Sequence, residues 1–102
     1  MLFDSTPWLF VRDGIENADD APGIYALFAK DGRLLYIGQS EVSVRSRLLR
    51  HIDGKEGAGT QQAFSYRYYL CTDSIKRESD LLAAYFLNYG QLPPCNGVLP
   101  RG

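Results

Sequence analysis

The residues best suited to chemistry are two tyrosines and a short run of arginines. Tyr25 and Tyr36 lie in the tripeptides GIY and YIG, and Arg45, Arg47 and Arg50 follow within one short stretch. Phenolic hydroxyls donate and accept hydrogen bonds, and clustered guanidinium groups form a local basic surface. The sequence therefore predicts a polar site that can contact a phosphate, provided that the fold brings the two stretches together.

A β-hairpin is the element expected to position the tyrosines. Residues 23–30 and 33–38 are short, apolar and rich in strand-forming residues, which is typical of strands covered on both faces. Between them, Asp31 and Gly32 are a strong signal for a two-residue hairpin loop. We therefore predict two antiparallel strands in this part of the chain.

With that loop, Tyr25 faces Gly38 and Leu27 faces Tyr36 across the hairpin. Residues two apart on a strand share a face, so the two tyrosines project from the same side with backbones roughly 7–8 Å apart. Their hydroxyls are expected to converge on one spot. Gly38 has no side chain and is expected to leave that spot open to an incoming group.

The segment after the hairpin, residues 40–54, has the pattern of an amphipathic helix. Apolar residues recur every four positions, a serine near the start can act as a cap, and a glycine stands at the end. Arg47 and His51, four residues apart, are expected to lie together on a different stripe of this helix. Gln39 and Ser40, at the exit of the hairpin, could donate hydrogen bonds to a phosphate.

The rest of the chain reads as a loop, a strand and a helix. Residues 53–62 are polar and glycine-rich, which predicts a mobile loop, and the aromatic-rich residues 63–72 predict a third strand. A second helix is predicted over residues 74–90. Its apolar side includes three residues: Leu82, Phe86 and Tyr89.

Length and composition indicate a single globular domain. The chain has 102 residues, of which 45% are hydrophobic, enough for one core. We expect residues 1–21 to form an N-terminal arm that packs Trp8 and Phe10 on the core. Residues 22–102 are then the domain itself.

Charge and hydropathy exclude some classes of protein. The net charge of −1 excludes a strongly basic surface, although residues 1–22 hold five of the twelve acidic residues and leave a small basic face elsewhere. No apolar run approaches the roughly 20 residues that span a bilayer, and the N-terminus lacks the pattern of a signal peptide. We expect a cytoplasmic protein without a membrane partner. Cys71 and Cys95 have no metal-ligand spacing and are predicted to be free thiols.

The two tripeptides carry a resemblance to a known family. GIY and YIG at this spacing, followed by an Arg-x-x-x-His segment and a later helix and asparagine, resemble the GIY-YIG nuclease superfamily over residues 22–96. The chain is most similar to its small stand-alone bacterial members and to the N-terminal domain of the bacterial excision-repair nuclease. The resemblance implies an α/β (α+β) fold with a three-stranded antiparallel sheet flanked by helices, and DNA as the partner, as in DNA repair.

The resemblance also implies roles for individual residues. Two motif tyrosines order the site, and one helps to deprotonate the attacking water; an arginine stabilises charge on the phosphate, and an asparagine braces the C-terminal segment. Phosphodiester hydrolysis needs such groups because negative charge builds on the phosphoryl oxygens. The predicted catalytic residues are Tyr25, Tyr36, Arg47 and His51. The predicted substrate-binding residues are Gly38, Gln39, Ser40 and Asn96.

One position departs from the family pattern. Members carry a glutamate on the second helix that holds a single divalent cation, and counting back about a dozen residues from Asn96 leads to Ala84. Glu78 is our candidate ligand for Mg²⁺ or Mn²⁺, with Asp80 as the alternative. Asp80 is about one helical turn from Ala84 but short, whereas Glu78 has the family's residue type but lies about 240° around the helix.

Three functions follow from these observations. The first is a metal-dependent endonuclease that hydrolyses DNA, with branched or otherwise shaped DNA as the expected target because the basic face is small. The second is a nucleic-acid-binding module that has lost hydrolysis at Ala84. The third is a protein-interaction module, which the acidic N-terminal arm would suit.

Overall fold

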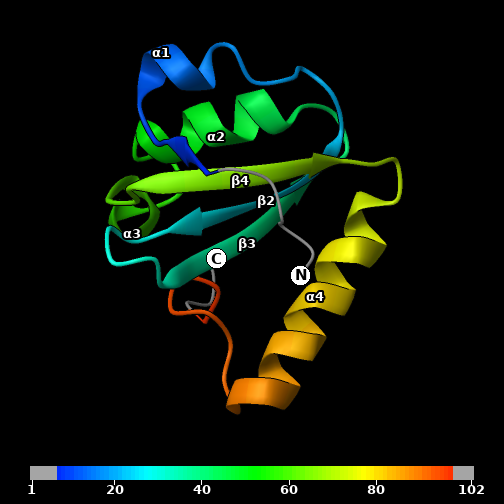
Figure 1. Cartoon of the computed structure of the whole chain (residues 1–102). Helices are drawn as coiled ribbons and strands as arrows, with labels where there is room; N and C mark the ends of the chain where they lie inside the picture. Colours follow the sequence, from blue (N-terminus) through cyan, green and yellow to red (C-terminus); the bar gives the residue numbers. More distant parts are fainter. Residues whose placement is uncertain (1–6, 98–102) are drawn as a thin grey trace.

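A computed structural model describes residues 7–97 of the chain. Figure 1 shows a central sheet with α1 and α2 on one side and α4 on the other. The elements are β1 (Trp8–Leu9), α1 (Arg12–Ile15), β2 (Gly23–Phe28), β3 (Leu34–Ser40), α2 (Val44–Ile52), α3 (Ala58–Gln61), β4 (Ser65–Leu70) and α4 (Ser74–Tyr89). The α+β architecture predicted from the sequence is confirmed.

The sheet is antiparallel throughout, in the order β1-β4-β2-β3. Strands β2, β3 and β4 correspond to the three strands that were predicted. The sheet has a fourth strand, β1, in which Trp8 pairs with Tyr66 and Leu9 with Ser65 along the free edge of β4. The sequence did not predict β1 because two residues are too few to show an alternating pattern.

The predicted hairpin register is confirmed at both tyrosines, but the loop has a different length. The amide of Ala29 donates to the carbonyl of Arg33, and the amide of Gly32 donates to the carbonyl of Ala29. Three residues therefore form the loop, and Gly32 takes a positive φ of 90°. This geometry is a common three-residue hairpin loop in which the glycine adopts the left-handed conformation.

A β-bulge restores the register that the longer loop would have shifted. Phe28 pairs with Leu34, whereas Leu27 pairs with Tyr36, which leaves Leu35 as an extra residue in β3. Beyond the bulge, Tyr25 pairs with Gly38 as predicted. The loop and the bulge each shift the pairing by one residue, and the two shifts cancel.

Two apolar layers hold the sheet between the helices. Tyr25 and Leu27 point from β2 into the layer under α1 and α2, where Leu48 is also fully buried. The alternate residues of β2, Ile24 and Ala26, point into the layer under α4. Because β2 is central and covered on both faces, its sequence is apolar throughout.

The N-terminal arm packs on the core with one of its two predicted anchors. Phe10 is buried and contacts the ring of Tyr66 edge-on, and Ile15 of α1 is fully buried. Trp8 remains 57% exposed, so its predicted packing is wrong. Its strand joins the sheet through backbone pairing at an edge, and this leaves the indole in solvent. Residues 1–6 of the predicted arm lie outside the described residues, and the domain boundary stays a prediction.

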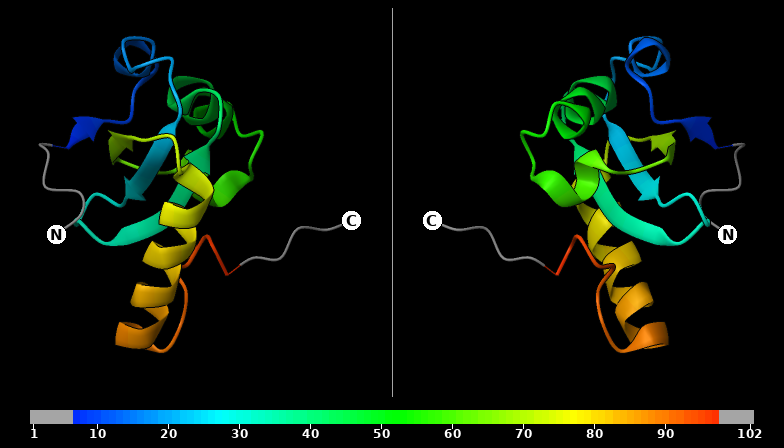
Figure 2. Two further views of the ribbon diagram at one scale, coloured as in Figure 1. Left: turned by 90° about the vertical axis from the view of Figure 1, so that its right-hand side faces the viewer. Right: turned by 90° about the vertical axis from the view of Figure 1, so that its left-hand side faces the viewer.

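Helix α4 was predicted correctly in extent but not in its buried side. It ends where Gly90 takes a positive φ of 73° and donates its amide to the carbonyl of Phe86. Leu81 packs toward the sheet, but Phe86 is 51% and Tyr89 66% exposed. Figure 2 shows the reason: the second half of the helix extends beyond the sheet.

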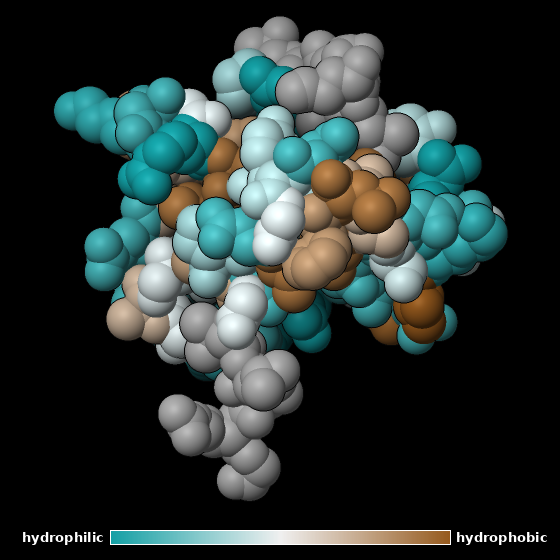
Figure 3. All heavy atoms as spheres, turned by 90° about the horizontal axis from the view of Figure 1, so that it is seen from below, coloured by the Kyte–Doolittle hydropathy of each residue, from teal (hydrophilic) through white to brown (hydrophobic). Residues whose placement is uncertain are grey.

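A groove of about 620 Å³ separates α4 from the hairpin. It is lined mainly by apolar side chains, including Leu34, Ile37, Leu81 and Tyr85. Figure 3, seen from below the view of Figure 1, shows apolar residues gathered on this side of the molecule with hydrophilic ones around them. Among the described helices, none is long and apolar enough to cross a membrane.

Candidate active site

The two motif tyrosines lie together, as the hairpin register requires. Their ring centroids are 6.1 Å apart. Tyr25 is fully buried, whereas Tyr36, on the edge strand β3, is partly exposed. Of the two hydroxyls, that of Tyr36 is therefore the one that a substrate can reach.

Gly38 has a different role from the one predicted. A Cβ atom at this position would lie 2.5 Å from the ring of Tyr25 and 2.7 Å from that of Tyr36. The space that we expected to be open to an incoming group is thus filled by the Tyr25 ring. Gly38 is needed because it lets this ring lie directly against the backbone of β3.

Helix α2 brings a histidine to the tyrosines. The helix begins after Ser43, whose side chain accepts a hydrogen bond from the amide of Ser46. One end of the fully buried His51 ring contacts the hydroxyl of Tyr25, with 2.7 Å between Nε2 and the oxygen. The other end contacts the hydroxyl of Thr60, 2.7 Å from Nδ1.

The positions of the protons in this series of hydrogen bonds are predicted from the neighbouring donors. Arg47 lies beside the Tyr25 hydroxyl and lowers its pKa, and a guanidinium can only donate hydrogen bonds. We therefore predict that the Tyr25 hydroxyl donates to Nε2 of His51, 2.7 Å away. In that tautomer His51 carries its own proton on Nδ1 and donates it to Thr60.

Burial keeps this network uncharged. Desolvation lowers the pKa of His51 to about 4, so the imidazole is neutral near pH 7. Burial also raises the pKa of Tyr25, and the proximity of Tyr36 raises it further. Burial raises the pKa of Tyr36 as well, while Arg47 opposes that shift. Near neutral pH both tyrosines are therefore protonated and the His51 imidazole is uncharged. Arg47 beside them is positively charged.

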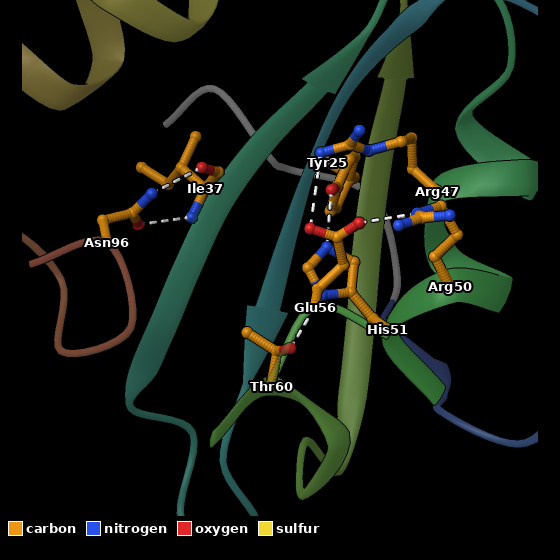
Figure 4. Close-up of polar contacts among 8 residues, drawn as sticks. All are labelled: Tyr25, Ile37, Arg47, Arg50, His51, Glu56, Thr60 and Asn96. Carbon is orange, nitrogen blue, oxygen red and sulfur yellow. Dashed lines mark hydrogen bonds and ion pairs between the residues drawn. The ribbon is translucent and has the colours of Figure 1, made fainter. Parts of the chain in front are cut away.

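Arg47 meets an acidic residue that the sequence analysis did not single out. Glu56 lies between two arginines, with its Oε2 atom 2.6 Å from Nε of Arg50 and its Oε1 atom 3.9 Å from Nη2 of Arg47. Figure 4 shows the carboxylate pointing toward both guanidinium groups, next to Tyr25 and His51. Arg50 lowers the pKa of Glu56, which is therefore ionised near neutral pH.

Both residues missed by the sequence analysis come from the segment predicted as a mobile loop. Residues 53–62 contain the short helix α3, which places the buried Thr60 against His51. The only available signal was a single carboxylate, Glu56, a few residues after three arginines of opposite charge. Nothing in the periodicity of this glycine-rich stretch marked Thr60.

The two candidate metal ligands on α4 have different surroundings. Glu78 is half-buried, and its negative charge raises the pKa of Tyr36. Burial raises the pKa of Glu78 itself, and the positive charge of Arg47 opposes that rise. Asp80 is exposed and pairs with Lys76 at 2.7 Å. Ala84 lines the apolar groove between α4 and the hairpin. Only Glu78 shares the electrostatic environment of the tyrosines.

Comparison with known proteins decides the family. The sequence profile of the GIY-YIG catalytic domain matches residues 21–84, more than half of the chain. The chain belongs to the GIY-YIG family. GIY-YIG domains are nuclease domains that generally use divalent metal ions, so the match indicates nuclease activity in general terms and a nucleic acid as substrate. Among curated proteins, none matches the chain significantly.

The residues of this GIY-YIG domain fit a cation held by one carboxylate. Within residues 7–97, no group of three or more His, Cys, Asp or Glu residues is placed to enclose a metal ion. Mg²⁺ commonly keeps several of its waters and binds through one or two carboxylates together with substrate phosphates. Glu78, whose charge raises the pKa of Tyr36, is a carboxylate that could hold such a cation, and a substrate phosphate would supply the remaining charge.

The other predicted substrate-binding residues already have partners in the GIY-YIG domain. Asn96 donates from Nδ2 to the carbonyl of Ile37 at 2.9 Å and accepts from the Ile37 amide at 2.8 Å. Gln39 accepts a hydrogen bond from Ser74 at the start of α4. The Ser40 hydroxyl accepts from two amides in the turn before α2. Figure 4 shows Asn96 on the opposite side of β3 from Tyr25 and Arg47.

Proposed function

We propose that this GIY-YIG domain is a divalent-metal-dependent endonuclease that hydrolyses phosphodiester bonds of DNA. The observation that carries the proposal is the packing of the two motif tyrosines against each other and against His51, with Arg47 and Glu78 both influencing the pKa of Tyr36. Hydrolysis needs a group that orients water and accepts its proton, together with positive charge for the phosphoryl oxygens. Tyr36 presents a partly exposed hydroxyl that can orient the water, and Arg47 supplies the positive charge; the proton of the water would pass to bulk solvent through this exposed hydroxyl.

In the mechanism that we propose, each residue has a distinct part. Tyr36 contacts the attacking water through its partly exposed hydroxyl, and Arg47 donates hydrogen bonds to the phosphoryl oxygens as their negative charge grows. Tyr25 is buried and acts as a positioning residue, since it links Arg47 to His51. Glu78 would hold the divalent cation, Mg²⁺ or Mn²⁺, which when bound supplies Lewis-acid stabilisation of the same phosphoryl charge.

The geometry favours this function over a module that has lost hydrolysis. The argument for lost hydrolysis depended on Ala84, and Ala84 lines the groove on the α4 side, whereas Glu78 interacts electrostatically with the tyrosine site. A carboxylate in the family's role can therefore come from six residues, about 1.7 helical turns, earlier in α4. Selectivity for branched or flapped DNA stays a prediction, supported by the small basic face.

A cleavage assay tests the proposal. Labelled single-stranded, duplex, flapped and four-way DNA would be incubated with Mg²⁺ or Mn²⁺ and the wild type, Tyr36→Phe or Arg47→Ala. We expect cleavage by the wild type and its loss in both variants. The absence of cleavage on every substrate by folded wild type would overturn the proposal and favour a domain that binds without cutting.

A further inference from the structure

The two arginines of the site hold an internal carboxylate. Arg50 forms a close ion pair with Glu56, and Arg47 approaches the other oxygen of the same carboxylate. The Glu56 side chain is only 22% exposed, so it lies within the cleft rather than on the outer surface. The carboxylate thus lies between two guanidinium groups of which one, Arg47, is the proposed phosphate ligand.

Arg47 keeps hydrogen-bonding capacity that Glu56 does not use. The distance of 3.9 Å between Nη2 of Arg47 and Glu56 is longer than a direct hydrogen bond. In the part of the chain that the structure describes, the buried Nε atom of Arg47 has no hydrogen-bond partner. Unpaired buried donors are rare in folded proteins and call for an explanation. The Nη2 atom of Arg47 therefore remains able to donate to an anion that approaches it more closely than Glu56 does.

The carboxylate also occupies the cleft in which the reaction is proposed to occur. A cavity of about 200 Å³ is lined by Tyr36, His51, Glu56 and Thr60, together with Cys95. A phosphodiester, like a carboxylate, presents two anionic oxygens to a guanidinium fork. A phosphate that enters this cavity would therefore compete with Glu56 for the same guanidinium donors.

The segment that carries Glu56 is bounded by two glycines with positive φ angles. Gly54 and Gly57 have positive φ values of 77° and 105°, a region that glycine enters without strain. The exposed Lys55 is the other residue between them. Displacement of Glu56 would take place by a change of backbone angles at these two glycines, next to the Lys55 amide that donates to the carbonyl of Arg50 at the end of α2.

We propose that the Glu56 carboxylate occupies the position of a substrate phosphodiester between Arg47 and Arg50, and that substrate binding displaces it. The inference deepens the proposed function and rests on it, since it takes a phosphodiester as the ligand. Glu56 then sets the affinity of the site. Only an anion that contacts both arginines better than this carboxylate can enter.

DNA binding without cleavage tests the inference. The affinity of labelled flapped DNA would be measured by fluorescence anisotropy in EDTA for the wild type, Glu56→Gln, Glu56→Ala and Glu16→Gln. Glu16 is exposed at the end of α1, so its variant is a control for the change in net charge. We expect both Glu56 variants to bind DNA about 3- to 10-fold more tightly, because they remove the ion pair between Glu56 and Arg50 and the repulsion between Glu56 and a DNA phosphate. The DNA affinity of Glu16→Gln should rise by less than about twofold.

Two further variants and one ligand complete the test. The gain should disappear in Arg47→Ala/Glu56→Gln compared with Arg47→Ala alone. Inorganic phosphate should shift the ¹⁵Nε resonances of Arg47 and Arg50 at lower concentration in Glu56→Gln than in the wild type. This phosphate titration tests the position of Glu56 even if DNA is never cleaved, so its failure is distinct from a failure of the proposed nuclease.

Three results would overturn the inference. The first is equal DNA affinity in Glu56→Gln and Glu16→Gln. The second is a gain that persists without Arg47. The third is loss of cleavage in Glu56→Gln at unchanged DNA affinity, which would make Glu56 a participant in catalysis rather than an occupant of the phosphate position.

Discussion

The two faces of the sheet differ in the number of polar side chains that they bury. On the α2 face, the hydroxyls of Tyr25 and Thr60 and the ring of His51 are buried, and each makes a short hydrogen bond. On the α4 face, the sheet contributes mainly apolar side chains, and the second half of the helix is exposed. The comparison indicates that the polar groups of the site are also part of the core on the α2 face, whereas the proposed site residue of α4, Glu78, lies near the start of that helix and does not line the apolar groove.

The largest effect is expected from removing the positively charged side chain of Arg47 on the α2 face. Arg47→Ala should lower kcat for DNA cleavage about 10²- to 10³-fold, because the charge on the phosphoryl oxygens loses a positioned donor. Arg33→Ala is the matched control, since Arg33 lines the groove on the α4 side. Single-turnover cleavage rates of the two variants measure the difference. Equal losses in both would contradict the separation of the faces.

The buried imidazole should make the α2 face sensitive to acid. The folded protein holds the pKa of His51 at about 4, below its ordinary value of 6.5, so the unfolded chain binds more protons between these values. The resulting stability is fully present above pH 6.5 and is lost as the pH falls toward 4. Urea unfolding should show the wild type losing about 3 kcal/mol more over this range than His51→Gln. Parallel pH curves for the two proteins would refute the assignment.

A single methyl group should distinguish a packed glycine from a permissive one. Gly38→Ala places a Cβ atom against the rings of Tyr25 and Tyr36, and we expect it to lower the free energy of unfolding by about 1–3 kcal/mol. At Gly14, the nearest atoms to an added Cβ are at ordinary contact distances, 3.6 Å or more. Gly14→Ala should therefore change the free energy by less than about 0.5 kcal/mol. Denaturant titrations that rank the two variants in the opposite order would disprove this packing account.

The hydroxyl of Thr60 should have a smaller effect on stability. Thr60→Val leaves Nδ1–H of His51 buried without an acceptor, at an expected cost of about 1 kcal/mol. The ¹⁵N chemical shifts of the imidazole report the tautomer directly. We expect a proton on Nδ1 in the wild type and a change in the tautomer populations in Thr60→Val. A wild-type proton on Nε2 would contradict the hydrogen-bond directions derived above.

The smallest effect is expected at the end of α4. Leu87 is 85% exposed. Leu87→Ala should therefore change the free energy of unfolding and the activation free energy of cleavage by less than about 0.5 kcal/mol each. A thermal unfolding curve and a cleavage time course are sufficient to check this. A large loss of activity would show that the exposed end of α4 contacts the substrate.

Much of the fold could be predicted because local signals and global packing agree. The Asp31-Gly32 turn signal and the apolar strands on either side of it led to the correct partner for each tyrosine, although the loop and the bulge were not foreseen. The exposed end of α4 could not be predicted, since an apolar helical stripe indicates a buried face only where a neighbouring element covers it.

The candidate site was predictable only where the motif residues carried it. His51 was expected on a different stripe from the apolar residues, yet it is fully buried because α3 folds over it. Glu56 and Thr60 were missed because a glycine-rich segment has no periodicity that reveals its tertiary contacts. Glu78 and Asp80 were both candidates for the metal ligand, because an ideal helix places Glu78 far around from Ala84 and leaves Asp80 about one turn away on a short side chain.

The measurement that tests the account most directly is cleavage of flapped DNA in Mg²⁺ by the wild type, Glu78→Gln and Asp80→Asn. Both substitutions remove one negative charge from α4, but only Glu78 interacts with Tyr36 and Arg47. We predict cleavage by the wild type and Asp80→Asn and none by Glu78→Gln. Full activity of Glu78→Gln would contradict the proposed metal ligand, and silence of the folded wild type would contradict the nuclease itself.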